Sequence, residues 1–268
     1  MKTQNAPQFG ISNYFLLIVI PIHIAILGAF FFYQEYTWMH LAGTLLIYTA
    51  FGGFGLELTF HRMISHHNFS YKYSWMKNLF VLWGSLACQG SLIAWTALHR
   101  NHHVHVDTDL DHQAPKHGLW SSYIGWTVNP SLTQKIKISL VRDLLRNPYY
   151  LFLDKYYYVL IYATHLAIAI ISPSFYFLAF LPGTLLSFHV SSINNLIGHN
   201  LKIGQRPFKV DDWSTDVWWA ALFSWGISFQ NTHHHDPMEI NYGKHSGIDP
   251  GFYLYQLIAS MGWVKRNV

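Results

Sequence analysis

Long apolar runs separated by polar segments dominate this chain. The clearest run, residues 14–32, contains no charged residue. As an α-helix it would extend about 28 Å, close to the hydrocarbon thickness of a bilayer, about 30 Å. Three further runs are similarly apolar, and Ser172, Pro173 and Ser174 separate the last two. The pattern predicts an all-α, multi-pass membrane protein with four transmembrane helices at about 14–32, 41–60, 156–171 and 175–197.

A fifth apolar stretch, residues 78–98, is long enough to span but is interrupted by small and polar residues, namely Gly84, Ser85, Gln89, Gly90, Ser91 and Thr96. Histidine clusters lie directly before and after it. Clusters that share one metal site must stand on the same side of the membrane. We therefore expect an interfacial or re-entrant helix here rather than a fifth span.

The placement of positive charge tests this topology independently. The two predicted outer turns, residues 33–40 and 172–174, contain no Lys or Arg, so all 17 basic residues fall on the other side. By the positive-inside rule that side is the cytoplasm, which would hold both termini and a helical cap formed by residues 100–155 and the tail after 201. Lys135, Lys137 and Arg142 suit either this topology or a phosphate-bearing acyl carrier. No repeat or linker divides the chain, so a single domain, 1–268, is predicted.

The composition is typical of a membrane protein and also indicates metal binding. Hydrophobic residues make up 51% of the chain and charged residues 11%, against about 25% charged in soluble domains. The net charge of +4 is explained by the lipid bilayer, without a nucleic-acid partner. A single cysteine, Cys88, excludes a disulfide framework and a cysteine-based metal site. Histidine, with 18 copies, outnumbers Lys and Arg together, which indicates metal binding.

Three histidine clusters stand where apolar segments end: HRMISHH from His61, HRNHH from His99, and QNTHHH from Gln230. In the second cluster His99, His102 and His103 have i, i+3, i+4 spacing, so they project from one helical face. Gln230, His233 and His234 repeat that spacing, and Asn195 and His199 are four residues apart at the end of the last run. The spacing predicts a shared site that could hold two metal ions in the cap.

Other polar residues of the apolar segments and loops are assigned to packing, to the bundle interior or to contacts with the metal-binding imidazoles. His23, His165 and His189 are interpreted as hydrogen-bonded packing residues. Glu57 lies four residues before His61 inside a predicted span, where a charge is costly, so we expect it to face the bundle interior. Four carboxylates near the clusters could each accept the second N–H of a metal-binding imidazole or belong to a solvated loop: Asp107, Asp109, Asp111 and Asp236.

The clusters, followed by VDTDLDHQAPKHGLW, NNLIGH and the closing KHSGIDPGFYLYQLIASMGWV, resemble the membrane-bound fatty acid desaturase family, particularly its acyl-CoA or acyl-lipid Δ9 branch, from about residue 51 to 268. The resemblance implies eight metal ligands, listed here: His61, His66, His99, His102, His103, His199, His233 and His234. It implies that Asn195 holds a metal-bound water. Gln230 replaces the family's usual first histidine of the third box and would bind through its amide oxygen or support a water. His67 and His235 have no assigned counterpart.

The resemblance also implies a reaction and its participants. Membrane desaturases remove two hydrogens from an acyl chain with O₂, two electrons and two iron ions (Fe²⁺). Zinc, which has no redox chemistry, would be inert in this step. The fatty acyl substrate would be an acyl-CoA, an acyl-carrier protein or an acyl-lipid. No flavin, nucleotide or iron–sulfur motif is present, so the electrons would come from a separate donor of the ferredoxin, rubredoxin or cytochrome b5 type with its reductase.

Two other functions use similar residues. A hydroxylase, ketolase or alkane monooxygenase could be built on the same histidine boxes. A metal transporter is a more distant alternative, because transport needs polar ligands near the bilayer midplane, whereas these clusters stand at segment ends.

Overall fold

The computed structural model describes residues 11–133, 136–200 and 203–266, and these are mostly helical. Three helices are long and apolar enough to cross a membrane: Phe15–Glu35, Trp38–Ser65 and Pro173–His199. They cover the predicted spans 41–60 and 175–197 and all but the first residue of the span 14–32. The remaining predicted span, 156–171, is the helix α10 (Tyr157–Ile171), whose 15 residues are fewer than the usual 20 or so, so the count of four spans is not confirmed.

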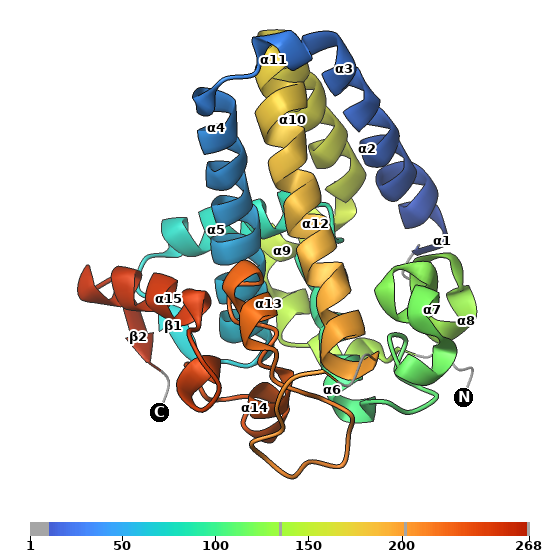
Figure 1. Cartoon of the computed structure of the whole chain (residues 1–268), viewed down its shortest axis with the longest axis vertical. Helices are drawn as coiled ribbons and strands as arrows, with labels where there is room; N and C mark the ends of the chain where they lie inside the picture. The colour runs from blue at the N-terminus through green and yellow to red at the C-terminus, as the bar shows by residue number, and fades with distance from the viewer. Residues whose placement is uncertain (1–10, 134–135, 201–202, 267–268) are drawn as a thin grey trace.

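The long helices run side by side along the longest axis of the molecule (Figure 1). The first consists of α1 (Ile11–Tyr14), η1 (Phe15–Val19), α2 (Ile20–Ala25), η2 (Ile26–Gly28) and α3 (Ala29–Phe32), and η3 (Tyr33–Glu35) follows. The second is α4 (Trp38–Tyr48) with the π-helical η4 (Thr49–Ser65), and the third is α11 (Pro173–Phe175), η9 (Tyr176–Phe180), α12 (Leu181–Asn195) and η10 (Leu196–Asn200). The labels α3 and α11 lie at the same end of this bundle, away from the histidine-bearing helices α6 and α14.

The ambiguous stretch 78–98 forms two helices, α5 (Ser74–Leu86) and α6 (Leu92–His105). They are separated by a turn in which Cys88 and Gly90 have positive φ angles of 59° and 99°. The Ser91 side chain then accepts the N–H of Ala94 and caps α6. The segment is therefore not one spanning helix, in agreement with the prediction.

Shorter helices gather at the lower end of the bundle in Figure 1 and form the predicted cap. Their bounds are η5 (Pro115–His117), α7 (Leu119–Tyr123), η6 (Gly125–Val128), α8 (Pro130–Thr133), η7 (Ile138–Val141), η8 (Leu144–Arg146), α9 (Pro148–Lys155), α13 (Trp218–Phe223), α14 (Gln230–His235) and η11 (Tyr242–Lys244). Lys135 lies outside the described residues.

The all-α prediction missed a small sheet. Strand β1 (Phe69–Tyr71) pairs antiparallel with β2 (Val264–Arg266), which follows helix α15 (Pro250–Ser260). Each strand has only three residues, so neither carries an alternating pattern long enough to predict. The two strands also lie almost 200 residues apart, because β1 ends at Tyr71 and β2 begins at Val264.

A buried arginine joins the end of the second long helix to the last third of the chain. The Arg62 side chain is fully buried, and its Nε donates to Glu57 Oε1 at 2.8 Å. Its Nη2 lies 2.9 Å from both carboxylate oxygens of Asp249, and Nη1 donates to the Ile240 carbonyl. The guanidinium also lies 4.3 Å from the ring centre of Tyr242. The contacts of Arg62 therefore join η4 to residues 240–249 near the C-terminal end of the chain.

We predict that Asp249→Asn destabilises the fold by about 3 kcal/mol or more, because losing one partner of a buried ion pair leaves charge uncompensated. The midpoint of thermal unfolding in detergent measures this effect. The matched control is Asp211→Asn, which changes an exposed carboxylate. Equal midpoints for the two variants would show that the Arg62 pair does not stabilise the fold.

Candidate metal centre

Four helical elements bring the histidines to the cap end of the bundle. His61 lies in the last turns of η4 and His66 directly after it. The second cluster occupies the last turns of α6, the third forms α14, and His199 lies in η10. Since helical turns place residues three to four apart on one side, α6 and α14 each present several imidazoles inward, whereas η10 presents His199 alone. The structure brings all eight predicted ligands together in two groups.

The first group contains five imidazoles, from His61, His66, His99, His103 and His233, with one nitrogen of each within 4.8 Å of all the others. Their Nε2 atoms meet in pairs: His61 and His233 at 3.1 Å, His233 and His103 at 2.9 Å, His103 and His99 at 3.1 Å, and His99 and His66 at 2.7 Å.

Hydrogen bonds among these five nitrogens account for only part of the four contacts, because one N–H makes only one linear hydrogen bond and at most two of the contacts can therefore be linear. Each ring nitrogen offers either one N–H or one lone pair, not both. His61 Nδ1 lies 3.0 Å from Glu57 Oε2 and must donate to it, so His61 Nε2 presents a lone pair to the group. Lone pairs that converge in a buried space need a cation, and imidazole nitrogen suits transition metals. The residues present therefore fit a metal ion.

The second group contains His102, His199 and His234, again within 4.8 Å. Each has a carboxylate at Nδ1: Asp111 at 2.9 Å from His102, Asp107 at 3.4 Å from His199, and Asp212 at 2.8 Å from His234. The Nε2 atoms of His102 and His234 are buried and hydrogen-bond to no described atom. Carboxylates at Nδ1 fix the tautomer that leaves the Nε2 lone pair free for a metal.

Burial keeps most of these imidazoles neutral. Burial, and then the neighbouring imidazoles, hold the pKa values of His66, His99, His103 and His233 well below the usual value. Burial likewise lowers the pKa of His234 to about 4. His102 differs: burial alone would lower its pKa, but the Asp111 carboxylate raises it. Neutral imidazole is the form that binds metal, so the protein prepares the ligands before a metal enters.

Gln230 stands beside the second group. Its amide nitrogen donates to the Ile227 carbonyl at 2.8 Å, which turns the amide oxygen toward the site, 3.4 Å from His199 Nε2. The side chain is buried. Gly198 leaves the room for it, since a methyl group at Gly198 would come within 2.6 Å of Gln230 Cγ. The amide oxygen thus occupies a place where a fourth ligand would stand.

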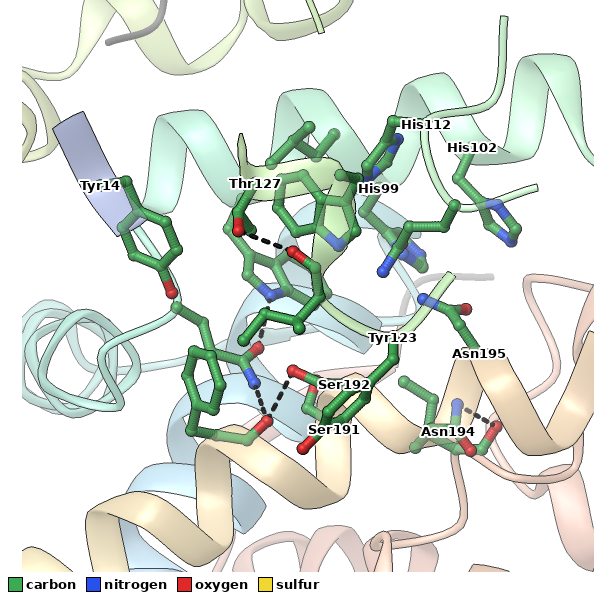
Figure 2. A pocket seen from close by; sticks show the side chains of 18 of the residues that line it. Tyr14, His99, His102, His112, Tyr123, Thr127, Ser191, Ser192, Asn194 and Asn195 are labelled. Carbon is green, nitrogen blue, oxygen red and sulfur yellow. Dashed lines mark hydrogen bonds between the residues drawn. The ribbon is translucent and has the colours of Figure 1, made fainter. Parts of the chain in front are cut away.

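A pocket opens beside the two groups (Figure 2). His99, His102 and Asn195 lie at one end, and Tyr14 from the first long helix lies at the other. The wall between them includes Trp95, Ile124, Trp126, Phe188 and Ile227. Trp95 stacks on His99 with ring centres 5.0 Å apart. The pocket therefore presents both aromatic and polar surface next to His99 of the first group and His102 of the second.

Some of the other residues singled out in the sequence contact the two imidazole groups, and the rest do not. Glu57 is buried, as predicted. Asp107 and Asp111 contact imidazoles, whereas Asp109 pairs with Lys116 at 2.7 Å and the exposed Asp236 accepts the N–H of Met238. His67 and His235 lie outside both groups, and His235 stacks on Phe208. The packing interpretation of three histidines agrees with their contacts: His23 meets His189 at 2.9 Å, and His165 meets Tyr176 Oη at 3.1 Å.

Sequence reasoning missed Asp212, Asp249 and Tyr242. Asp212 pairs with a histidine 22 residues later from an irregular loop, which has no periodic signal. Asp249 and Tyr242 both contact Arg62. The position of Arg62 inside HRMISHH is the one feature of the sequence that could have pointed to these two residues.

Comparisons with known proteins agree with this geometry. Residues 36–245 match the model of a family described as fatty acid desaturase. The chain is 33% identical over 235 residues to an sn-1 stearoyl-lipid 9-desaturase of Anabaena variabilis, covering 87% of this chain and 84% of that one. It is 32% identical over 240 residues to Delta-9 acyl-lipid desaturase 1 of Arabidopsis thaliana, covering 85% and 75%. An sn-2 palmitoyl-lipid 9-desaturase of Nostoc sp. is 30% identical over 274 residues, covering 98% and 92%.

Three observations lead to the same assignment: the matches over most of the chain, the apolar helices long enough to span a bilayer, and the buried cluster of histidines. The chain belongs to the fatty acid desaturase family and is a membrane-bound, oxygen-dependent oxidoreductase.

Proposed function

We propose that this protein is an acyl-lipid Δ9 desaturase, which introduces a cis double bond into the fatty acyl chain of a membrane glycerolipid. The three relatives above, all named as acyl-lipid 9-desaturases, support the position and the carrier. The observation that carries the proposal is the pair of imidazole groups at the end of an aromatic-lined pocket. A pocket that fixes the depth of a bound chain also fixes which methylenes face the metals.

The two groups are proposed to hold two iron ions. His61, His66, His99, His103 and His233 would bind one, and His102, His199 and His234 would bind the other with the amide oxygen of Gln230. Asn195, which lines the same pocket as His102 and Gln230, would hold a metal-bound water. When bound, the iron pair would supply the redox chemistry that acid–base side chains lack for breaking an alkyl C–H bond with O₂ and two electrons.

The chain's own residues orient and shield this site. Glu57, Asp107, Asp111 and Asp212 hold Nδ1 protons and so aim the Nε2 lone pairs. Arg62 holds Glu57 in place and joins the first histidine cluster to Ile240 and Asp249, which follow the third cluster in the chain. Trp95, Phe188 and Trp126 line the pocket with apolar surface that excludes water from the reacting methylenes.

The membrane arrangement proposed here has four spans, with α10 as the third, in a single domain. The histidine side and both termini would face the cytoplasm, because the described turn Tyr33–His40 and the turn 172–174 contain no Lys or Arg. A separate ferredoxin, rubredoxin or cytochrome b5 with its reductase would deliver electrons to this side. Charged surfaces steer such brief encounters.

We predict that a desaturase-deficient bacterial host expressing this chain accumulates monounsaturated acyl chains with the double bond at carbon 9. His102→Ala combined with His103→Ala removes one imidazole from each group and should lower that product at least 100-fold. Gas chromatography and mass spectrometry of the extracted lipids measure both results.

The matched control combines His67→Ala with His235→Ala, which removes two exposed imidazoles of the same sequence motifs and should leave the product unchanged. Hydroxy or keto products would instead assign the site to a hydroxylase or ketolase. Double bonds confined to acyl-CoA or acyl-carrier protein would contradict the lipid carrier.

Gln230 should affect binding only of the metal in the second group. We predict that Gln230→Ala lowers the affinity of the second group for its metal by about tenfold or more. Gln230→His supplies a nitrogen ligand in place of the amide oxygen and should keep both metals bound. Elemental analysis of purified protein during a chelator titration measures the loss. Identical release curves for Gln230→Ala and the unchanged protein would show that Gln230 does not contribute to metal binding.

A further inference from the structure

Helix α15 exposes an apolar stripe that the desaturase site does not use. Tyr253, Leu257 and Met261 recur at i, i+4 and i+8, and each is about half exposed, at 56%, 49% and 49%. The opposite side of the helix is buried through Gly251, Tyr255 and Ile258. Residues 250–263 include no charged residue. Two uncharged polar residues, Gln256 and Ser260, are exposed beside the stripe. A helix against water usually carries charged residues on its outer face, so a stripe with none beside it indicates an apolar or interfacial surrounding.

The depth of α15 in the molecule agrees with a lipid surrounding. In Figure 1 the helix lies crosswise to α4. It packs on the second long helix at Gly53, where an added methyl group would come within 2.8 Å of Leu254 Cδ1. Gly53 lies 12 residues after Leu41, where the predicted span 41–60 begins (53 − 41). This is about 18 Å at 1.5 Å per residue, within a hydrocarbon core of about 30 Å and past its middle toward the histidine-bearing side.

Two lysines stand next to the end of this helix. After α15, a turn with Gly262 at φ 71° leads into β2, and Lys72 N–H donates to the Trp263 carbonyl at 2.9 Å. Ser70 is opposite Lys265 and Tyr71 is opposite Val264. Because side chains alternate along a ladder, Lys72, Trp263 and Lys265 share the face that lies opposite to the buried Tyr71 and Val264.

The charge on this face is positive. Lys72 and Lys265 are both exposed, and neither forms a salt bridge with a carboxylate of the described chain. The nearby acid, Glu239, pairs with Lys244 at 3.6 Å and lies toward Arg266, on the other face of the ladder. Exposed Tyr73 and Trp75 follow Lys72 in the chain, and such aromatic residues concentrate at membrane interfaces.

We propose that α15 lies in the bilayer interface and that Lys72 and Lys265, on either side of Trp263, bind the phosphate of an anionic membrane lipid. The apolar stripe would enter the acyl boundary while the lysines meet the headgroups, the arrangement of an interfacial amphipathic element. An acidic carrier protein would also meet the lysines, but a brief redox contact has little use for a long apolar stripe set at lipid depth.

This contact would connect the bilayer to the metal centre. Asp249 caps α15 by accepting the N–H of Phe252 at 3.0 Å, and the same carboxylate binds Arg62. Arg62 follows His61 directly and holds Glu57, the partner of His61. The helix seated in lipid is therefore attached through two side chains to a ligand of the first group.

Lipid retention tests the anionic site independently of desaturation. We expect Lys72→Glu combined with Lys265→Glu, in the full chain purified from membranes containing phosphatidylglycerol and phosphatidylethanolamine, to retain at least fivefold less phosphatidylglycerol per chain by native mass spectrometry. The control, Arg146→Glu with Lys209→Glu, makes the same charge change at exposed sites elsewhere in the chain. Unchanged metal content shows that both variants are folded. Equal retention in the two variants would overturn the proposal.

A spin label at Leu257→Cys tests the depth of the helix. Cys88 is buried and burial raises the pKa of its thiol to about 12, so labelling is directed to the introduced cysteine. In lipid nanodiscs the label should be more accessible to O₂ than to a water-soluble nickel complex, and a label at Lys209→Cys should show the reverse. A water-exposed label at 257, or variants that lose binding of the electron carrier but keep the lipid, would overturn the proposal in favour of a protein-docking surface.

Discussion

The architecture depends on a set of ring nitrogens that hydrogen bonds among themselves satisfy only in part. In the first group, neighbouring Nε2 atoms stand 2.7 to 3.1 Å apart, and His61 must present a lone pair because Glu57 takes its other proton. In the second, buried Nε2 atoms of His102 and His234 have no hydrogen-bond partner in the described chain. Buried polar atoms without partners are costly, so these groups make physical sense as ligands.

The rest of the fold supplies what this convergence requires. Long helices carry His61 and His199 to the same end of the bundle, and the short helices α6 and α14 complete the groups from the cap. Because the ligands come from distant segments, their positions must be fixed by contacts outside the site. Arg62 provides such a contact, since it joins the first histidine cluster to Asp249 and Ile240 in the last third of the chain. The same carboxylate caps α15, so the element proposed to sit in lipid and the metal centre share one anchor.

The sequence predicted the parts of this structure that are periodic or local. Long apolar runs located the three long helices, and helical spacing placed His99, His102 and His103 on one face. The cost of a charge in an apolar segment was enough to predict that Glu57 is buried. Long-range pairing was not predictable: the Asp212 contact to His234 comes from an irregular loop, and the β1–β2 ladder joins two three-residue strands across most of the chain. The predicted run 156–171 matches α10 to within one residue, but its 15 residues are too few for length and hydropathy alone to show that it spans the membrane.

The most direct test of the central claim is anomalous diffraction at the iron edge from crystals of the protein reconstituted with Fe²⁺ without oxygen. The account predicts two iron peaks per chain, one about 2.1 Å from imidazole nitrogens of His61, His66, His99, His103 and His233, the other at a similar distance from His102, His199 and His234. A single iron, or iron bound away from these eight side chains, would contradict it.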